Sequence, residues 1–112
     1  MRTISKPTEI TEAEDKTAAL LASLWQRVRP LVEERMATIE LAATAAPLTE
    51  ELRKEAASSA HKLAGSLGMY GYDEGTRVAR EIELLLDSSR TPETKNLGPL
   101  VAELRDAVFP DA

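Results

Sequence analysis

Apolar residues recur at three- and four-residue steps along most of this chain, and no stretch alternates like a β-strand. Steps of this size place side chains on one face of an α-helix. The longest such stripe consists of Leu21, Leu24, Trp25, Val28, Val32, Met36, Ile39 and Ala43. Three further helices are expected over about 50–69, 73–87 and 97–109, with an extra turn near 92–96. Amphipathic helices joined by short loops bury their stripes in a bundle, so the sequence predicts an all-α, antiparallel up-and-down four-helix bundle.

Turn and capping residues set the expected boundaries. Pro30 interrupts the first stripe, and because the apolar register continues across it, we expect a long helix kinked near this residue. Thr49 is expected to cap the second helix, and Gly71 to adopt a positive φ in the turn after it. Residues 1–11 show no clear period, so we expect a flexible N-terminal tail before one bundle domain at 12–110.

The totals of charged and reactive residues exclude several functions. The chain has 112 residues, no cysteine, one histidine and a formal net charge of −5. These counts exclude disulfides, thiolate sites and multi-histidine metal sites. Nucleic acid is not expected as a partner, because phosphate binding needs a basic surface. No apolar run reaches the ~18 residues of a membrane span and no signal-peptide core is present, so we expect a cytoplasmic protein without membrane contact.

The only histidine, His61, lies in the second expected helix. The buried stripe of that helix consists of Leu52, Ala56, Ser59, Leu63, Ser66, Leu67 and Tyr70. At about 100° per residue, His61 lies roughly 180° from the centre of this stripe. Its neighbours at helical spacing are Lys54, Ala57, Ser58, Ala64, Gly65 and Gly68. Each glycine inside a helix costs about 0.8–1.0 kcal/mol relative to alanine, so two of them beside an exposed histidine indicate room for another molecule. A surface helix with small residues and a stray histidine explains the pattern equally well.

One exposed histidine limits the available chemistry. A hydrolytic triad needs a nucleophile and an acid aimed at the ring, and Ser58 and Ser66 offer no such arrangement. The stretch 65–68 lacks the lysine of a phosphate-binding loop. What remains is nucleophilic catalysis by the imidazole, whose neutral nitrogen attacks an activated phosphoryl group and carries it as a phosphoramidate. Such a site needs an exposed ring, a low surface for a docking protein and nearby cations such as Lys62.

The segment 60–83 resembles histidine-containing phosphotransfer (HPt) domains, including those of chemotaxis histidine kinases. The similarity is carried by Ala60-His61-Lys62-Leu63-Ala64-Gly65-Ser66-Leu67-Gly68-Met69-Tyr70-Gly71-Tyr72, Gly75 and Val78-Ala79-Arg80-Glu81-Ile82-Glu83. As a helical pattern it extends over about residues 17–108. The resemblance implies an HPt-like bundle in which His61 accepts a phosphoryl group and exchanges it with receiver-domain aspartates of a bacterial-type two-component phosphorelay.

The same resemblance implies roles for neighbouring residues. Gly65 corresponds to a glycine that lets the receiver approach, and Glu83 to a glutamate that hydrogen-bonds the other ring nitrogen. The alternative for Glu83 is a solvated surface carboxylate. The family commonly has a lysine where this chain has Ala64, so phosphate neutralisation is assigned to Lys62, with Lys54 as a second candidate.

Two arginines of the third expected helix, Arg77 and Arg80, are further cations near the motif. The expected partner-binding surface consists of Lys54, Ala57, Ser58, Ala64, Gly65, Gly68 and Arg80.

The resemblance implies a response-regulator receiver domain or a histidine kinase as the partner. We expect a monomer without a cofactor of its own, with Mg²⁺ bound only by the partner receiver. The chain has no ATP-binding motif, so a phosphoryl carrier is expected rather than a kinase. One alternative is a non-catalytic adaptor that binds a partner through the face around Gly65 and Gly68. Another is a bundle that self-associates through the same face.

Overall fold

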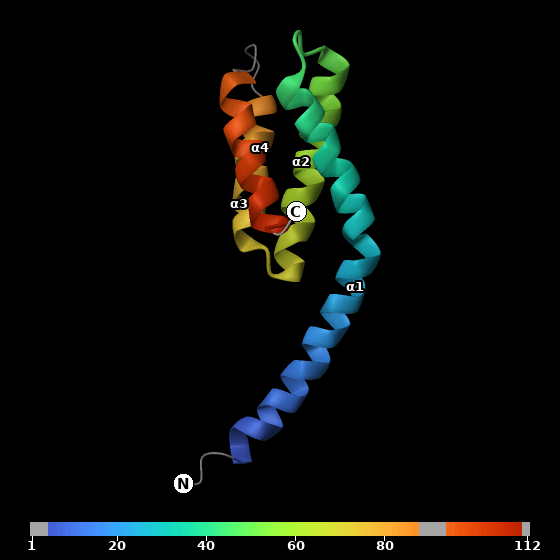
Figure 1. The fold of residues 1–112 in the computed structure, drawn as a ribbon, viewed down its shortest axis with the longest axis vertical. Coiled ribbons are helices and arrows are strands. Elements are labelled where there is room, and N and C mark those ends of the chain that lie inside the picture. Colours follow the sequence, from blue (N-terminus) through green and yellow to red (C-terminus); the bar gives the residue numbers. More distant parts are fainter. Residues whose placement is uncertain (1–4, 88–93, 111–112) are drawn as a thin grey trace. The chain divides into compact units, whose positions relative to one another are not determined.

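The computed structural model describes the backbone of residues 5–87 and 94–110. Within those ranges the regular structure is helical throughout. The elements are α1 (Ser5–Thr44), α2 (Glu50–Ser66), the short 3₁₀ helix η2 (Leu67–Tyr70), α3 (Asp73–Leu86) and α4 (Thr94–Val108) (Figure 1). The prediction of an all-α chain with four main helices is confirmed. The chain divides into two units, Met1–Pro30 and Leu31–Ala112, and the second holds the C-terminal part of α1 together with α2, α3 and α4.

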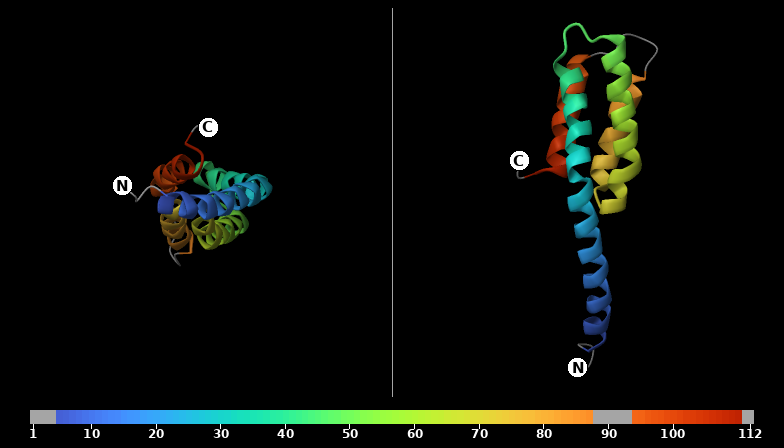
Figure 2. Two further views of the ribbon diagram at one scale, coloured as in Figure 1. Left: turned by 90° about the horizontal axis from the view of Figure 1, so that it is seen from below. Right: turned by 90° about the vertical axis from the view of Figure 1, so that its right-hand side faces the viewer.

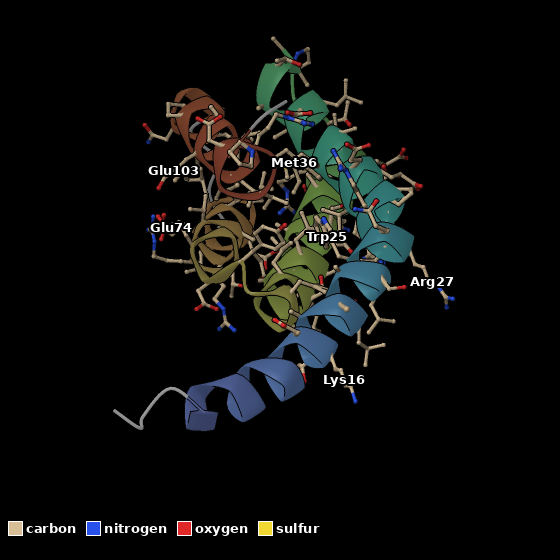
Figure 3. The ribbon with its side chains drawn as sticks, turned by 60° about the horizontal axis from the view of Figure 1, so that its bottom comes forward. Lys16, Trp25, Arg27, Met36, Glu74 and Glu103 are labelled. Atoms are coloured by element: carbon tan, nitrogen blue, oxygen red, sulfur yellow. The ribbon has the colours of Figure 1, made fainter. Side chains whose placement is uncertain are left out.

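The core of the second unit is built from one apolar face of each of its helices, which lie side by side (Figure 2). Met36, labelled in Figure 3, is one of its largest fully buried side chains. Buried with it are Val32, Ile39 and Ala42 of α1, Ala56, Ala60 and Leu63 of α2, Leu67 of η2, Val78, Ala79, Ile82 and Leu86 of α3, and Leu97, Val101, Leu104 and Val108 of α4. The three- and four-residue steps therefore do mark the faces that the second unit buries.

Ion pairs tie α4 to its neighbours at the edge of this core. Arg105 of α4 reaches Glu40 of α1 with two hydrogen bonds, of 2.5 and 2.9 Å. Arg77 of α3 bonds Glu74 of its own helix at 2.5 Å and Glu103 of α4 at 2.7 Å, and these two glutamates are labelled in Figure 3. The hydrogen bond to Glu74 raises the pKa of Arg77 above its ordinary value. Arg77 is thus engaged by carboxylates between α3 and α4.

Helix α1 differs from expectation at its beginning. It starts at Ser5, whereas the sequence predicted a helix only from about residue 12. Pro7 stands in the first turn, where a missing amide hydrogen costs nothing, so it does not prevent this start. Pro30 lies inside the same helix. A kink at Pro30, the division into tail and domain at residue 11 and the up-and-down order of all four helices stay predictions.

Helices α2 and α4 also differ from their expected bounds. The helix of His61 was expected to continue to about Met69, but α2 ends at Ser66 and the tighter η2 follows. Gly71 ends η2 with a φ of +88°, as the sequence predicted. Helix α4 begins at Thr94, and the part of the extra turn expected at 92–93 lies outside the described residues.

The N-terminus of α2 has the predicted cap. The Thr49 hydroxyl accepts a hydrogen bond from the amide of Leu52 at 3.2 Å, and two glutamates occupy the first turn. Replacing Thr49 by alanine leaves this amide unpaired, so the free energy of unfolding should fall by about 1 kcal/mol in urea titration. Thr38→Ala is the matched control, because the Thr38 hydroxyl only bonds a carbonyl within α1, and it should stay within about 0.5 kcal/mol of the wild type. Equal losses in the two variants would contradict the cap.

Candidate functional site

Helices α2 and α3 run in opposite directions beside each other. Gly71 and the short η2 join them. His61 of α2 contacts Glu83 of α3, and Arg53, two turns earlier on α2, donates to the carbonyl of Leu86, nearly one turn later on α3. Side chains from the two helices therefore meet along one seam, and the only histidine lies on it.

His61 is held at one nitrogen and is open elsewhere. Its Nδ1 lies 2.7 Å from Oε2 of Glu83, and its side chain is 74% exposed, whereas that of Glu83 is 23% exposed. A carboxylate can only accept, so this bond is satisfied when Nδ1 carries the ring proton. That tautomer leaves the lone pair of Nε2 free. The expected contact between His61 and Glu83 is therefore present.

A groove of about 440 Å³ lies beside the ring. It is lined by Arg53, Lys54, Ala57 and Ser58, which precede His61 on α2, by His61 itself, and by Glu83 and Asp87 of α3. Side chains on a helix lean towards its N-terminus, so the imidazole tilts over the turn that holds Ala57 and Ser58. These two side chains are small, and both line the groove.

Arg53 is a structural cation of this groove. It makes hydrogen bonds of 2.6 and 2.7 Å to the Glu50 carboxylate and also donates to the Leu86 carbonyl. The hydrogen bond from Arg53 lowers the pKa of Glu50, and the same bond raises the pKa of Arg53. The sequence analysis missed both Arg53 and Asp87 as groove residues. Asp87 follows Glu83 by one helical turn, which was the available signal, whereas the contact of Arg53 depends on how two helices pack.

The two glycines of the motif have different surroundings. A Cβ added at Gly65 would meet no atom within 4 Å, so Gly65 does leave open space one turn after His61. A Cβ at Gly68 would lie 3.3 Å from the Thr76 hydroxyl, so a side chain at Gly68 would press against α3. Gly68 is exposed, as the sequence predicted, but of the two glycines only Gly65 has open space at its Cβ position.

The two alanines expected around His61 are buried rather than exposed. Ala57 is 6% exposed and Ala64 is 8% exposed. On the helical wheel both fall between His61 and the core, and the packing of the second unit covers them. Ala57 lines the groove and Ala64 does not, and both offer little surface of their own.

The expected cations are spread around the ring. Lys54 lines the groove, whereas Lys62 and Arg80 are exposed and do not line it. Lys54 lies about 20° from His61 around the helix axis, and Lys62 lies about 100° away. Arg77 is held between α3 and α4, as described above, so it does not serve His61.

This arrangement and the comparisons agree on the class of protein. The profile of the Hpt domain family matches residues 23–108. The chain belongs to the Hpt domain family, whose members carry phosphoryl groups on histidine in phosphorelays and interact there with receiver domains and kinases. Neither the curated proteins nor the solved structures gave a match.

Two kinds of feature are absent from residues 5–87 and 94–110. None of the helices in that part of the chain is both long and apolar enough to cross a membrane. The same residues contain no cluster of three or more histidine, cysteine, aspartate or glutamate side chains suited to a metal ion.

Proposed function

We propose that this chain is a phosphorelay carrier in which His61 receives a phosphoryl group from a histidine kinase or a receiver aspartate and passes it to another receiver aspartate. One geometry supports this most: a largely exposed imidazole whose Nδ1 lies 2.7 Å from the Glu83 carboxylate. The proposed location is the cytoplasm, and one copy of the chain suffices for the reaction.

The chemical step needs little from the carrier beyond this geometry. The lone pair of Nε2 attacks phosphorus, the bond from phosphorus to the aspartyl oxygen breaks, and the carboxylate leaves with the electron pair. No proton has to leave Nε2. The proton on Nδ1 stays in place, and the charge of Glu83 stabilises the ring, which has become cationic. The reverse step delivers the group to the next aspartate. We expect Mg²⁺ to be bound by the receiver, where it would shield the transferring group.

Phosphotransfer profiling tests this function. The purified chain is mixed with each phosphorylated receiver domain of the source genome, using a radiolabelled phosphoryl group. Label that is labile in acid, stable in base and carried by the peptide containing His61 is the expected result. A chain that binds a receiver but never takes up label from any donor would be an adaptor, and that outcome would overturn the proposal.

Glu83→Gln should slow uptake from the receiver by about tenfold. A glutamine amide can donate to Nδ1, which stabilises the tautomer whose Nε2 carries a hydrogen and has no free lone pair. It also removes the negative charge beside the phosphorylated ring. The measurement is the rate constant for uptake at saturating receiver.

Glu81→Gln is the matched control for this change. It removes a carboxylate from the same helix, but one that pairs with Arg77 at 3.1 Å and does not contact His61. Its uptake rate should equal that of the wild type. If Glu83→Gln also transfers at the wild-type rate, Glu83 is only a surface carboxylate.

A further inference from the structure

The groove beside His61 contains balanced charges before any transfer. Arg53 and Lys54 supply two cations, and Glu83 and Asp87 supply two carboxylates. Glu83 is engaged with the imidazole and Arg53 with Glu50, and Arg53 also interacts electrostatically with Asp87. A phosphoryl group on Nε2 adds negative charge to this set. Its charge therefore has to be balanced by a cation that is not already bonded to another group of the protein.

Lys54 is the groove cation that is available. Arg53 is fixed by three hydrogen bonds to Glu50 and Leu86. Lys54 forms no ion pair within 4 Å with a carboxylate of the described residues, although its charge contributes to lowering the pKa of Glu50. Its ammonium is carried on a flexible four-carbon stem, so it can move towards a new anion.

Helix geometry also favours Lys54 over Lys62. Seven residues separate Lys54 from His61, which is about 20° of rotation and about 10.5 Å along the axis. The imidazole leans towards the N-terminus, over the turn that holds Ala57 and Ser58, and the flexible stem of Lys54 lets its ammonium reach back along the groove towards the ring. Lys62 lies about 100° away around the helix, does not line the groove, and is on the opposite side of His61 from Arg53 and Ala57.

We propose that Lys54 is the phosphate-neutralising residue of this chain: its ammonium contacts the phosphoryl group on Nε2 of His61 from the far end of the groove, a role that Lys62 does not fill. This rests on the proposed function of His61. The contact replaces the lysine that the family commonly carries at the position of Ala64. Because the cation approaches from the N-terminal side, the side of the ring above Gly65 stays free for the partner protein.

A small phosphoryl donor tests Lys54 without any docking protein. In phosphoramidate, Nε2 attacks phosphorus, the bond from phosphorus to the donor nitrogen breaks, and ammonia leaves. ³¹P NMR follows the uptake and then the pKa of the phosphoryl group attached to the ring. In Lys54→Gln the uptake should slow by about fivefold, and the pKa of the attached phosphoryl group should rise by about half a unit, because a nearby cation favours the dianion.

Three variants complete the test. Lys62→Gln, a change of the same kind on the same helix, should show the smaller change in both measurements, and Lys16→Gln on α1 should behave as the wild type. Lys54→Arg should restore the lower phosphoryl pKa, which a purely structural role would not do. The proposal is overturned if Lys54→Gln matches the wild type, or if Lys62→Gln shows the larger change. If the wild type itself takes up no phosphoryl group at His61, the proposed function fails and the role of Lys54 fails with it.

Discussion

Replacing His61 by glutamine should abolish phosphoryl uptake from every donor, to below the detection limit of a radiolabel assay. The glutamine amide has a similar reach and polarity, but its nitrogen lone pair is delocalised and does not attack phosphorus. The sequence contains no other histidine that could take over. The loss should be seen both with a phosphorylated receiver and with phosphoramidate. Uptake by His61→Gln at the wild-type rate would show that another residue is the acceptor.

The fold should survive this substitution, which makes the loss of uptake interpretable. The His61 side chain is 74% exposed, and its one described bond, to Glu83, can be replaced by a bond from the glutamine amide. The free energy of unfolding should therefore change by less than about 0.5 kcal/mol in urea titration. Receiver binding, measured by titration calorimetry, should also persist, because the surrounding surface is unchanged. A variant that neither binds nor folds would not support the assignment.

Local features of this fold could be predicted from the sequence because they depend on neighbours in the chain. The cap at Thr49 needs only a hydroxyl three residues before an amide, and the turn at Gly71 needs only a residue that tolerates positive φ. The buried stripe around Leu63 follows from a constant rotation per residue. That rotation did not predict where the helix ends, because α2 stops at Ser66 and η2 follows, whereas the sequence predicted a helix to about Met69.

Features that depend on two helices could be predicted only in part. The contact between His61 and Glu83 was expected because the resemblance supplied it, since no spacing within one helix brings residues 61 and 83 together. The resemblance implied no groove, so the groove was not predicted. Its lining by Arg53 and Asp87 depends on the distance and rotation between α2 and α3, which the periodicity of a single helix does not determine. The choice between Lys54 and Lys62 became possible only once that groove was visible.

Substitution of Gly65 is the second change with a large expected effect. It should raise the stability of the fold and slow phosphoryl transfer from the receiver. A Cβ at this position meets no atom within 4 Å, so an L-residue can occupy it without a clash at that atom. Glutamine is a better helix former than glycine, and Gly65→Gln should raise the free energy of unfolding by about 0.5–1 kcal/mol. The same side chain stands one turn from His61 on the surface that the receiver must approach. Displacing the partner by about 1 Å should slow transfer about a hundredfold.

Gly98→Gln is the matched control for this prediction. Gly98 also lies inside a helix with open space around its Cβ position, but it does not line the groove of His61. Both variants should take up the phosphoryl group from phosphoramidate at the wild-type rate. Gly65→Gln should gain stability in urea titration, whereas Gly98→Gln should not, because a side chain directly before Pro99 disfavours helical angles. Only Gly65→Gln should lose transfer from the receiver. If it exchanges with the receiver as fast as Gly98→Gln does, the partner does not approach across Gly65, and the helix carries that glycine for some reason other than docking.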